Sequence, residues 1–208
     1  MLFNNLSYKI RFLLLLVLST VMSACSQSGD NLGGSDEERA YDVLQCSANW
    51  EQIVQKYQKE PTQSLACRKV ALLAMYQLGH AGREVVYECL SDSHDVLTSE
   101  TAAMMMSDVY IQLGMVNMAQ RAAFEAMVKK TDISKCSRQL RRLIETALIT
   151  GQYDVARKYI SILENDTKHR DWARSMLRIV DNPELIIEQP VYQRLRKSYE
   201  NTEDQFFM

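Results

Sequence analysis

Two copies of one helix–turn–helix pattern lie between Thr101 and Leu163, and they constrain the fold more than any other feature of the chain. They read AAMMMSDVYIQLGMVNMAQRAAFEAM and LRRLIETALITGQYDVARKYISIL. In each copy, apolar residues recur at helical spacing on both sides of a glycine, Gly114 or Gly151. A period of about 3.6 residues gives each segment one apolar face, and glycine adopts at low cost the left-handed conformation that ends a helix. The pattern therefore predicts two amphipathic helical hairpins.

The first copy resembles the tetratricopeptide repeat, a family of stacked helical hairpins, in the order of its small, aromatic, glycine and alanine positions. The residues that carry the resemblance are Ser107, Tyr110, Gly114, Ala119 and Ala126. The second copy departs from the repeat, because Ile144 and Ala147 stand where a small residue and an aromatic one belong. The alternative is a pair of ordinary amphipathic hairpins.

Two further hairpins are expected upstream, with turns near Ala48 and Gly79, the second continuing through 85–90. Ser35 and Glu38 have the spacing of a capping box, so the first helix should begin directly after Ser35. Each hairpin would bury its apolar face only against its neighbours, which is how a solenoid is stabilised. With the resemblance, this predicts an all-α fold, a right-handed superhelix of about four tetratricopeptide-like hairpins.

Two helices are expected after the fourth hairpin. One contains Trp172 and ends at Asn182-Pro183, and the other runs from Val191 to Tyr199 as a cap. A terminal repeat needs a polar outer face, so the basic residues of this cap are expected to face solvent: Arg194, Arg196 and Lys197. The repeat domain would then cover residues 36–199, and residues 200–208 should fray.

Residues 1–24 have the features of a signal peptide, with Lys9 and Arg11 ahead of the apolar run FLLLLVLSTV. This run is shorter than the roughly 20 residues that span a bilayer as a helix. It leads into Met-Ser-Ala-Cys, which resembles the lipobox of bacterial lipoproteins. The resemblance implies that Cys25 is lipidated and that residues 25–35 tether the domain to a membrane. The alternative is an ordinary secretory signal.

The retention signal for the inner membrane would place an aspartate after the lipidated cysteine, and this chain has Ser26 there. The expected location is therefore the cell envelope, with the outer membrane favoured over the inner one. Whether the domain faces the periplasm or the cell surface stays open.

A second resemblance rests on the stretches SDVYIQLG, AQRAAFEAM and RRLIETALITGQYDVARKYISILE, together with Trp172-Ala173 and the segment from Pro190 to Lys197. They are similar to the soluble C-terminal region of a bacterial membrane-protein family of unknown function. The similarity covers roughly residues 50–207. Members of that family carry many N-terminal membrane spans, which this chain replaces by a lipid anchor. The resemblance supports helical repeats beside a membrane and implies no activity.

Four cysteines remain once Cys25 is assigned to lipid: Cys46, Cys67, Cys89 and Cys136. An even number in a chain that leaves the cytoplasm allows one or two disulfides. Small buried thiols at helix contacts are the alternative, and we favour it. The wide spacing, without a CxxC pair, predicts no metal site.

No combination of nucleophile and base stands out in the sequence. His80, His94 and His169 are scattered, and neither a glycine-rich phosphate loop nor a GxSxG motif is present. The sequence therefore predicts a protein that is not an enzyme and holds no cofactor. An unrecognised active site would need a deep cleft that gathers His94 or His169 with carboxylates.

In tetratricopeptide proteins the first helix of each hairpin lines a concave groove that binds extended or helical peptides. The corresponding positions in the third hairpin are Thr101, Met104, Asp108, Ile111 and Gln112. In the fourth hairpin they are Arg138, Arg141, Glu145, Leu148 and Ile149. Either Arg138 and Arg141 pair with an acidic partner, or they are surface arginines of little energetic consequence.

These patterns predict a lipid-anchored, non-catalytic scaffold that binds an envelope protein or peptide. The net charge of −2 and the signal peptide argue against nucleic acid as a partner. The alternative is an accessory lipoprotein that binds a glycan or another nutrient at the cell surface, which would require exposed aromatic rings.

Overall fold

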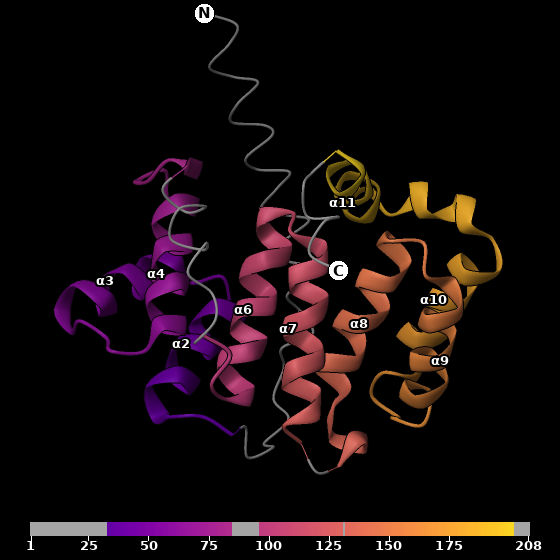
Figure 1. Ribbon diagram of the computed structural model, residues 1–208, viewed down its shortest axis with the longest axis horizontal. Coiled ribbons are helices and arrows are strands. Elements are labelled where there is room, and N and C mark those ends of the chain that lie inside the picture. The colour runs from indigo at the N-terminus through magenta and orange to yellow at the C-terminus, as the bar shows by residue number, and fades with distance from the viewer. Residues whose placement is uncertain (1–32, 85–95, 131, 202–208) are drawn as a thin grey trace, which may run out of the picture.

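The computed structural model describes residues 33–84, 96–130 and 132–201, and these residues form helices and turns without a strand (Figure 1). The α-helices are α2 (Asp36–Cys46), α3 (Trp50–Lys59), α4 (Leu65–Gln77), α6 (Glu100–Leu113), α7 (Val116–Val128), α8 (Ser137–Ile149), α9 (Tyr153–Leu163), α10 (Arg170–Asp181) and α11 (Pro190–Glu200). Two 3-10 helices, η2 (Ile133–Lys135) and η3 (Pro183–Glu188), lie before α8 and α11. The prediction of an all-α protein is confirmed.

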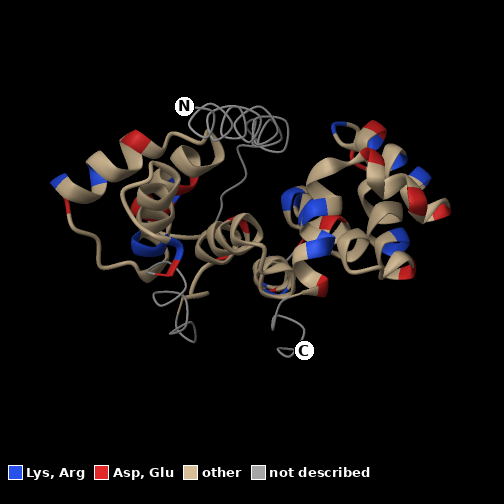
Figure 2. Cartoon of the chain, turned by 90° about the horizontal axis from the view of Figure 1, so that it is seen from above, with Lys and Arg blue, Asp and Glu red and all other residues tan. Residues whose placement is uncertain are grey.

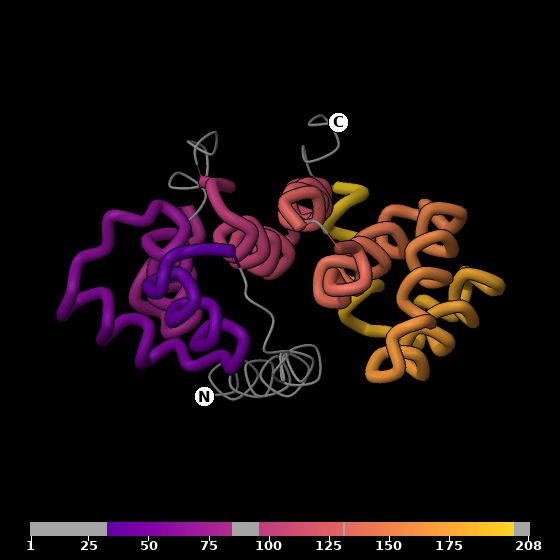
Figure 3. Tube along the Cα trace, turned by 90° about the horizontal axis from the view of Figure 1, so that it is seen from below, coloured from indigo at the N-terminus to yellow at the C-terminus, as the bar shows by residue number. Residues whose placement is uncertain are grey.

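Helices that follow one another in the chain pack against one another. The pairs α2–α3, α3–α4, α6–α7, α7–α8, α8–α9 and α9–α10 are all in contact, and α4 packs on α6. Figures 1 and 3 show α2 to α4 at one end of the molecule, α6 and α7 in the middle, and α8 to α10 at the other end. Sequential, hairpin-like packing is therefore confirmed; the helix expected at 85–90 lies outside the described residues.

Two helices also make contacts beyond their neighbours in the chain. The first helix, α2, packs directly on α6 as well as on α3 and α4. At the other end, the chain turns back so that α11 lies on α8 (Figure 1). The expectation that each hairpin contacts only its neighbours is thus incomplete, because both terminal helices fold back over the middle of the stack.

The middle helix α6 is buried on every side. Of its fourteen residues, all but Gln112 are buried. Figure 2 shows that α6 and α7 are mostly uncharged, whereas charged residues are numerous on the helices that flank them. A helix that is apolar around its whole circumference belongs to the core, so α6 is the central helix of the domain. None of the described helices combines the length and the hydropathy that spanning a bilayer requires.

The four predicted turns are formed as expected. Gly79, Gly114 and Gly151 have φ values of +76°, +83° and +78°, and Ala48 takes the same left-handed conformation at +52°. In each turn, the amide of the next residue donates to a carbonyl five residues back, as in the Schellman motif. These bonds are Asn49 to Leu44 (2.9 Å), His80 to Met75 (2.8 Å), Met115 to Tyr110 (2.9 Å) and Gln152 to Ala147 (2.8 Å).

The predicted capping box starts the first described helix. The Ser35 hydroxyl accepts a hydrogen bond from the Glu38 amide, and the Glu38 carboxylate accepts one from the Ser35 amide, both at 3.1 Å. Two amides that have no partner inside the helix are satisfied in this way. The helix begins at Asp36 for this reason, as predicted.

The last helix corrects one prediction. Arg194 and Lys197 are exposed, but Arg196 turns inward. Its guanidinium donates to the carbonyl oxygens of Leu148 (2.5 Å) and Ile149 (3.0 Å) and to the Tyr153 hydroxyl (2.8 Å). Carbonyls in the last turn of a helix lack intrahelical partners, so Arg196 caps α8 and fastens α11 to it.

The turn at Ala48 offers a test of this local analysis. An L-residue in the left-handed conformation costs about 1–2 kcal/mol, of which glycine recovers part after its own loss of backbone entropy, about 0.5–1 kcal/mol. Ala48→Gly should therefore raise the free energy of unfolding by about 0.5–1 kcal/mol in urea denaturation. The reverse change, Gly151→Ala, is the matched control, because its added Cβ meets no atom within 4 Å. It should lower the free energy of unfolding; a loss with Ala48→Gly would contradict the analysis.

Candidate functional site

One face of α8 carries charged residues at helical spacing. Arg138, Arg142 and Glu145 follow one another at intervals of four and three residues, which places them on the same side of the helix. That side faces α2 and α6, where Asp42 and Asp108 lie. We call these five residues the ion-pair network.

Arg138 occupies the centre of the ion-pair network. Its two terminal nitrogens bond both oxygens of Asp42, each at 2.8 Å, and Nη2 also bonds Asp108 Oδ2 at 2.6 Å. Arg142 bonds the other oxygen of Asp108 at 2.7 Å and Glu145 at 2.9 Å. Three helices that are distant in the sequence are therefore joined by charge-assisted bonds, which are about twice as strong as neutral ones.

These charges are largely removed from water. The side chains of Asp42, Asp108, Arg142 and Glu145 are 5–12% exposed, and that of Arg138 is 25% exposed. Burial by itself raises the pKa of Asp108, but the adjacent guanidinium groups of Arg138 and Arg142 outweigh it, and the pKa is lowered. Burial likewise acts to lower the pKa of Arg138, and Asp42 and Asp108 reverse that effect. Asp108 and Arg138 are therefore both ionised at neutral pH.

Tyr192 of α11 completes the arrangement on the far side of Glu145. Its hydroxyl donates to Glu145 Oε1 at 3.3 Å. Burial and the neighbouring carboxylate raise the pKa of Tyr192 well above its ordinary value, so the phenol keeps its proton and remains a donor. Through this hydrogen bond from Tyr192, the ion-pair network is connected to the last helix, α11, as well as to the first described helix, α2.

A second polar cluster fastens the segment that leads into α2. Glu100, at the start of α6, pairs with Lys130 at 3.0 Å and accepts hydrogen bonds from Gln139 (2.8 Å) and from the Gly33 amide (3.3 Å). Glu38 accepts hydrogen bonds from the Ser99 hydroxyl at 2.8 Å and the Ser64 hydroxyl at 3.2 Å. The N-terminal end of α2 is therefore held against α4 and α6 by polar bonds.

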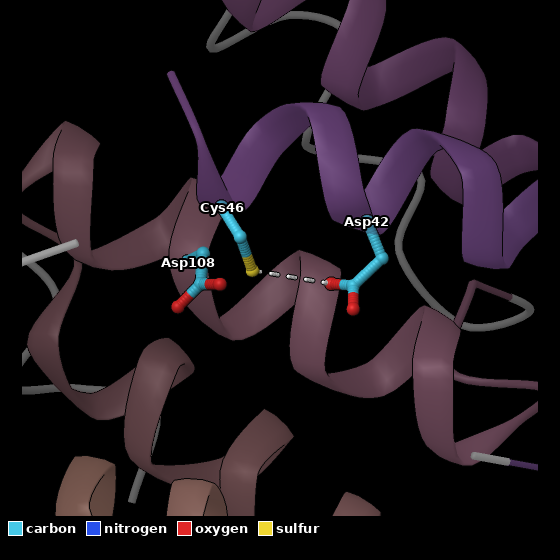
Figure 4. A group of neighbouring side chains, drawn as sticks. All are labelled: Asp42, Cys46 and Asp108. Carbon is cyan, nitrogen blue, oxygen red and sulfur yellow. Dashed lines mark hydrogen bonds between the residues drawn. The ribbon is translucent and has the colours of Figure 1, made fainter. Parts of the chain in front are cut away.

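One group within the described residues has the composition of a metal site: Asp42, Cys46 and Asp108, whose ligand atoms lie within 4.8 Å of one another (Figure 4). Both carboxylates are already bonded to arginine, and the guanidinium of Arg138 brings a positive charge to the place that a cation would need. Cys46 is disulfide-bonded, so it has no thiolate to offer. Its sulfur lies 4.0 Å from Asp42 Oδ1, the dashed line in Figure 4. In this structure the two carboxylates of the group bind the Arg138 guanidinium.

The cysteines divide between the two alternatives that the sequence left open. Cys67 and Cys136 are buried free thiols, as favoured, whereas the disulfide at Cys46 corrects that preference. Burial raises the pKa of the Cys67 thiol to about 11, which makes it unreactive at neutral pH. Cys89, like Cys25, lies outside the described residues.

Most of the predicted groove residues are buried. Seven of the ten are buried and three are partly exposed; the buried ones are Thr101, Met104, Asp108, Ile111, Glu145, Leu148 and Ile149, and the others are Gln112, Arg138 and Arg141. Arg141 stacks on Trp172, with its guanidinium 4.3 Å from the ring centroid, and Gln112 accepts a hydrogen bond from Gln77 at 3.1 Å. Neither Arg138 nor Arg141 is an ordinary surface arginine.

The chain itself contacts these positions from both ends. On the α2 side, the Gly33 carbonyl accepts hydrogen bonds from the amide and hydroxyl of Thr101, and Asp42 binds Arg138. On the α11 side, Tyr192 bonds Glu145, and Arg196 bonds the carbonyls of Leu148 and Ile149. The helices at the two ends of the described domain therefore lie on the face that the repeat resemblance assigns to a ligand.

Sequence reasoning missed four residues of this arrangement: Asp42, Arg142, Tyr192 and Arg196. For Arg142 a signal was present, because it lies four residues after Arg138 and three before Glu145, which places it on their face of the helix. Asp42, Tyr192 and Arg196 gave no local signal, since their partners are 96, 47 and 47 to 48 residues away in the chain.

The fold and this site define an all-helical protein of sequential hairpins closed by its own terminal helices. The sequence matches the model of a family of unknown function, DUF6057, over residues 4–208, and the chain belongs to that family. No curated protein and no solved structure matches it.

Removing the central arginine should show how much the domain depends on the network. Breaking a buried pair by removing one partner leaves an uncompensated buried charge, at a cost of about 3–5 kcal/mol. Arg138→Ala should lower the free energy of unfolding by that amount in urea denaturation. Arg157→Ala is the control, because Arg157 and Asp181 are 51% and 62% exposed, and such a pair contributes at most about 1 kcal/mol. Equal effects of the two substitutions would contradict the assignment.

The lowered pKa of Asp108 predicts a loss of stability in acid. A carboxyl whose pKa is lower in the folded protein stabilises it at pH values above the unfolded pKa, about 3.9 for aspartate, and this contribution disappears as the pH falls through the folded value. The free energy of unfolding should therefore decrease below about pH 4. Asp108→Asn should make this decrease less steep between pH 5 and pH 3. Equal slopes for both proteins in urea unfolding would contradict the proposed ionisation.

Proposed function

We propose that this protein is a lipid-anchored, non-catalytic scaffold of the cell envelope that binds another envelope protein or peptide. One observation carries the proposal: a helix of this chain, α2, already packs on α6 and is held to α8 by the two bonds from Arg138 to Asp42. Binding of a helix in a groove is a common mode of peptide recognition. A surface that can hold a helix of its own chain has the chemistry to hold a helix of another.

The proposal also includes the type of helical repeat and the handedness of the stack. We take the hairpins to be tetratricopeptide-like units of a right-handed superhelix, with α11 as the cap. The turns at Ala48, Gly79, Gly114 and Gly151 support it, as does Ser107, whose hydroxyl donates to the Ala119 carbonyl at 2.8 Å where the two helices of one hairpin approach closely. In that arrangement α4, α6 and α8 line the groove as the first helices of their hairpins, and α2, the first helix of the terminal hairpin, covers it by packing on α6.

The ionisable groups of the network favour binding over catalysis. Each of its carboxylates is bonded to an arginine, so none is a free base. Outside the network, the raised pKa of the Cys67 thiol keeps it protonated, so it is not a ready nucleophile. A general base needs a pKa near the working pH, whereas the pKa of Asp108 is shifted away from it.

The disulfide at Cys46 supports an address outside the cytoplasm, where disulfides persist. The lipobox-like sequence at Cys25 supplies the anchor in this proposal. Each buried methylene of an acyl chain contributes about 0.8 kcal/mol, so attachment of more than one chain would hold the domain at a membrane durably.

A glycan-binding role is less well supported. It would require exposed aromatic rings, and the ring of Trp172 is only partly exposed and has one face covered by the Arg141 guanidinium. A sugar stacks on an accessible aromatic face, and the Arg141 guanidinium occupies that position on one face of Trp172.

The anchor can be tested by changing one atom of one residue. Cys25→Ser should move the protein from the membrane pellet to the soluble fraction and abolish incorporation of a labelled fatty acid, because serine offers no thiol for the thioether. The measurement is immunoblotting of fractionated cells. Cys136→Ser is the matched control, since Cys136 is a buried free thiol, and it should leave both properties unchanged. Membrane retention and labelling of the Cys25 variant would contradict the lipoprotein proposal.

The scaffold itself is tested by crosslinking in cells. A tagged full-length protein should capture one envelope protein, identified by mass spectrometry, and the Cys25→Ser variant should lose it. Capture of nothing above background would contradict the scaffold and make small-molecule or glycan screening the next step. The substitution Arg138→Glu is unsuitable here, because it would disrupt the buried network as well as any partner contact.

A further inference from the structure

The first described helix, α2, is attached to the domain by an unusually polar face. Its buried residues are Glu38, Tyr41, Asp42, Gln45 and Cys46, and three of these five are charged or amide side chains. By contrast, α6 buries a largely apolar surface. A helix held by a polar face binds through hydrogen bonds and charge pairs, which a partner with the same groups can replace.

Two buried polar atoms of α2 find no hydrogen-bond partner. These are the hydroxyl of Tyr41 and the side-chain oxygen of Gln45, whose amide nitrogen does bond the Met105 carbonyl at 3.1 Å. Both residues are fully buried. A buried polar atom without a hydrogen-bond partner destabilises the folded state. The polar contacts of α2 are therefore favourable at Asp42 and unfavourable at the neighbouring Tyr41 and Gln45. On the opposite side, Val43 is 66% exposed and contributes little to holding the helix.

From these contacts we propose that α2 is an intramolecular occupant of the partner site, and that the partner is an acidic helix that replaces it. The inference rests on the proposed scaffold function and names the chemistry of its ligand. The replacing helix would present a carboxylate to Arg138 at the position of Asp42. It would also present a hydrogen-bond donor to the Met105 carbonyl about one turn later, at the position of Gln45. Charge complementarity supports an acidic partner, because Arg138 binds one carboxylate from α6 and a second from α2, and the second would be replaced by that of the partner. Arg138 is also the most exposed member of the network.

The occupation also accounts for the burial of the predicted groove. Thr101 and Asp108 would become accessible when α2 leaves, whereas Glu145, Leu148 and Ile149 would stay covered by α11. The partner surface is therefore the α6 end of the predicted groove, with Arg138 at its border.

A peptide of this chain is the probe. A fluorescent peptide of residues 33–49 with Cys46→Ser would be titrated against the full chain in detergent, and its binding followed by anisotropy. Full chain carrying Asp42→Asn loses the fork to Arg138, so its own α2 competes less, and the peptide should bind it at least about tenfold more tightly than it binds the unmodified chain. The same peptide with Asp42→Lys is the matched control and should lose this binding. Equal affinity for both chains, or equal binding of both peptides, would overturn the inference.

Hydrogen exchange of the unmodified chain provides a measurement that needs no variant. Amides 40–46 of α2 should exchange at least about tenfold faster than amides 104–113 of α6, because a displaceable helix opens locally. Equal protection of the two segments would mean that α2 is a permanent part of the fold, and would overturn the inference.

Two further measurements distinguish this inference from a second copy of the chain as the occupant and from a scaffold in which α2 stays in place. If the unmodified chain forms a dimer in light scattering without peptide, the occupant is α2 of a second copy, and the acidic partner is overturned. If an envelope protein is captured in cells while α2 is fully protected, the scaffold stands and only the displacement of α2 is overturned.

Discussion

Arg138 bonds Asp42 and Asp108 with one guanidinium group and so connects α2, α6 and α8. Taking charges out of water is costly, and their attraction compensates only when the geometry is good and the remaining hydrogen-bonding groups are satisfied. A shift of α2 along α6 would separate Asp42 from Arg138, and Asp42 would lose the bonds that compensate for its burial. The position of α2 is therefore specified by charge as well as by the burial of Tyr41 in the apolar core.

The same interaction explains why this domain is not a simple open stack. Hairpins that contact only their neighbours leave the first helices free to line a concave face. Here α2 lies on α6 at one side, and α11 lies on α8 at the other, held by Tyr192 and Arg196. The central helix α6 is consequently buried around its circumference. Function, in our proposal, depends on exchanging one of these internal contacts for an external one.

The local elements could be predicted from the sequence because their causes are local. The capping box at Ser35 and Glu38 lies within four residues, and each Schellman turn within six, so the residues that decide them are adjacent in the chain. Ala48 is the instructive case, since it took the place of glycine in the pattern and adopts a positive φ in the structure. The repeated spacing of Gly114 and Gly151 likewise indicated sequential hairpins, which the packing confirms.

What the sequence by itself determined was the nine described α-helices, the four turns and the all-α class of the described residues, since apolar period and turn chemistry act over a few residues. Only the tertiary structure decided that Arg138 pairs with Asp42, that Arg196 turns inward to cap α8, and that Cys46 is disulfide-bonded. Each of these depends on which distant segment lies opposite, and a basic residue or a cysteine has the same local signature whether it faces water or a partner. The ten groove positions show the difference: the repeat pattern assigned their helices, while the neighbours of α6 and α8 decided that seven of them are buried.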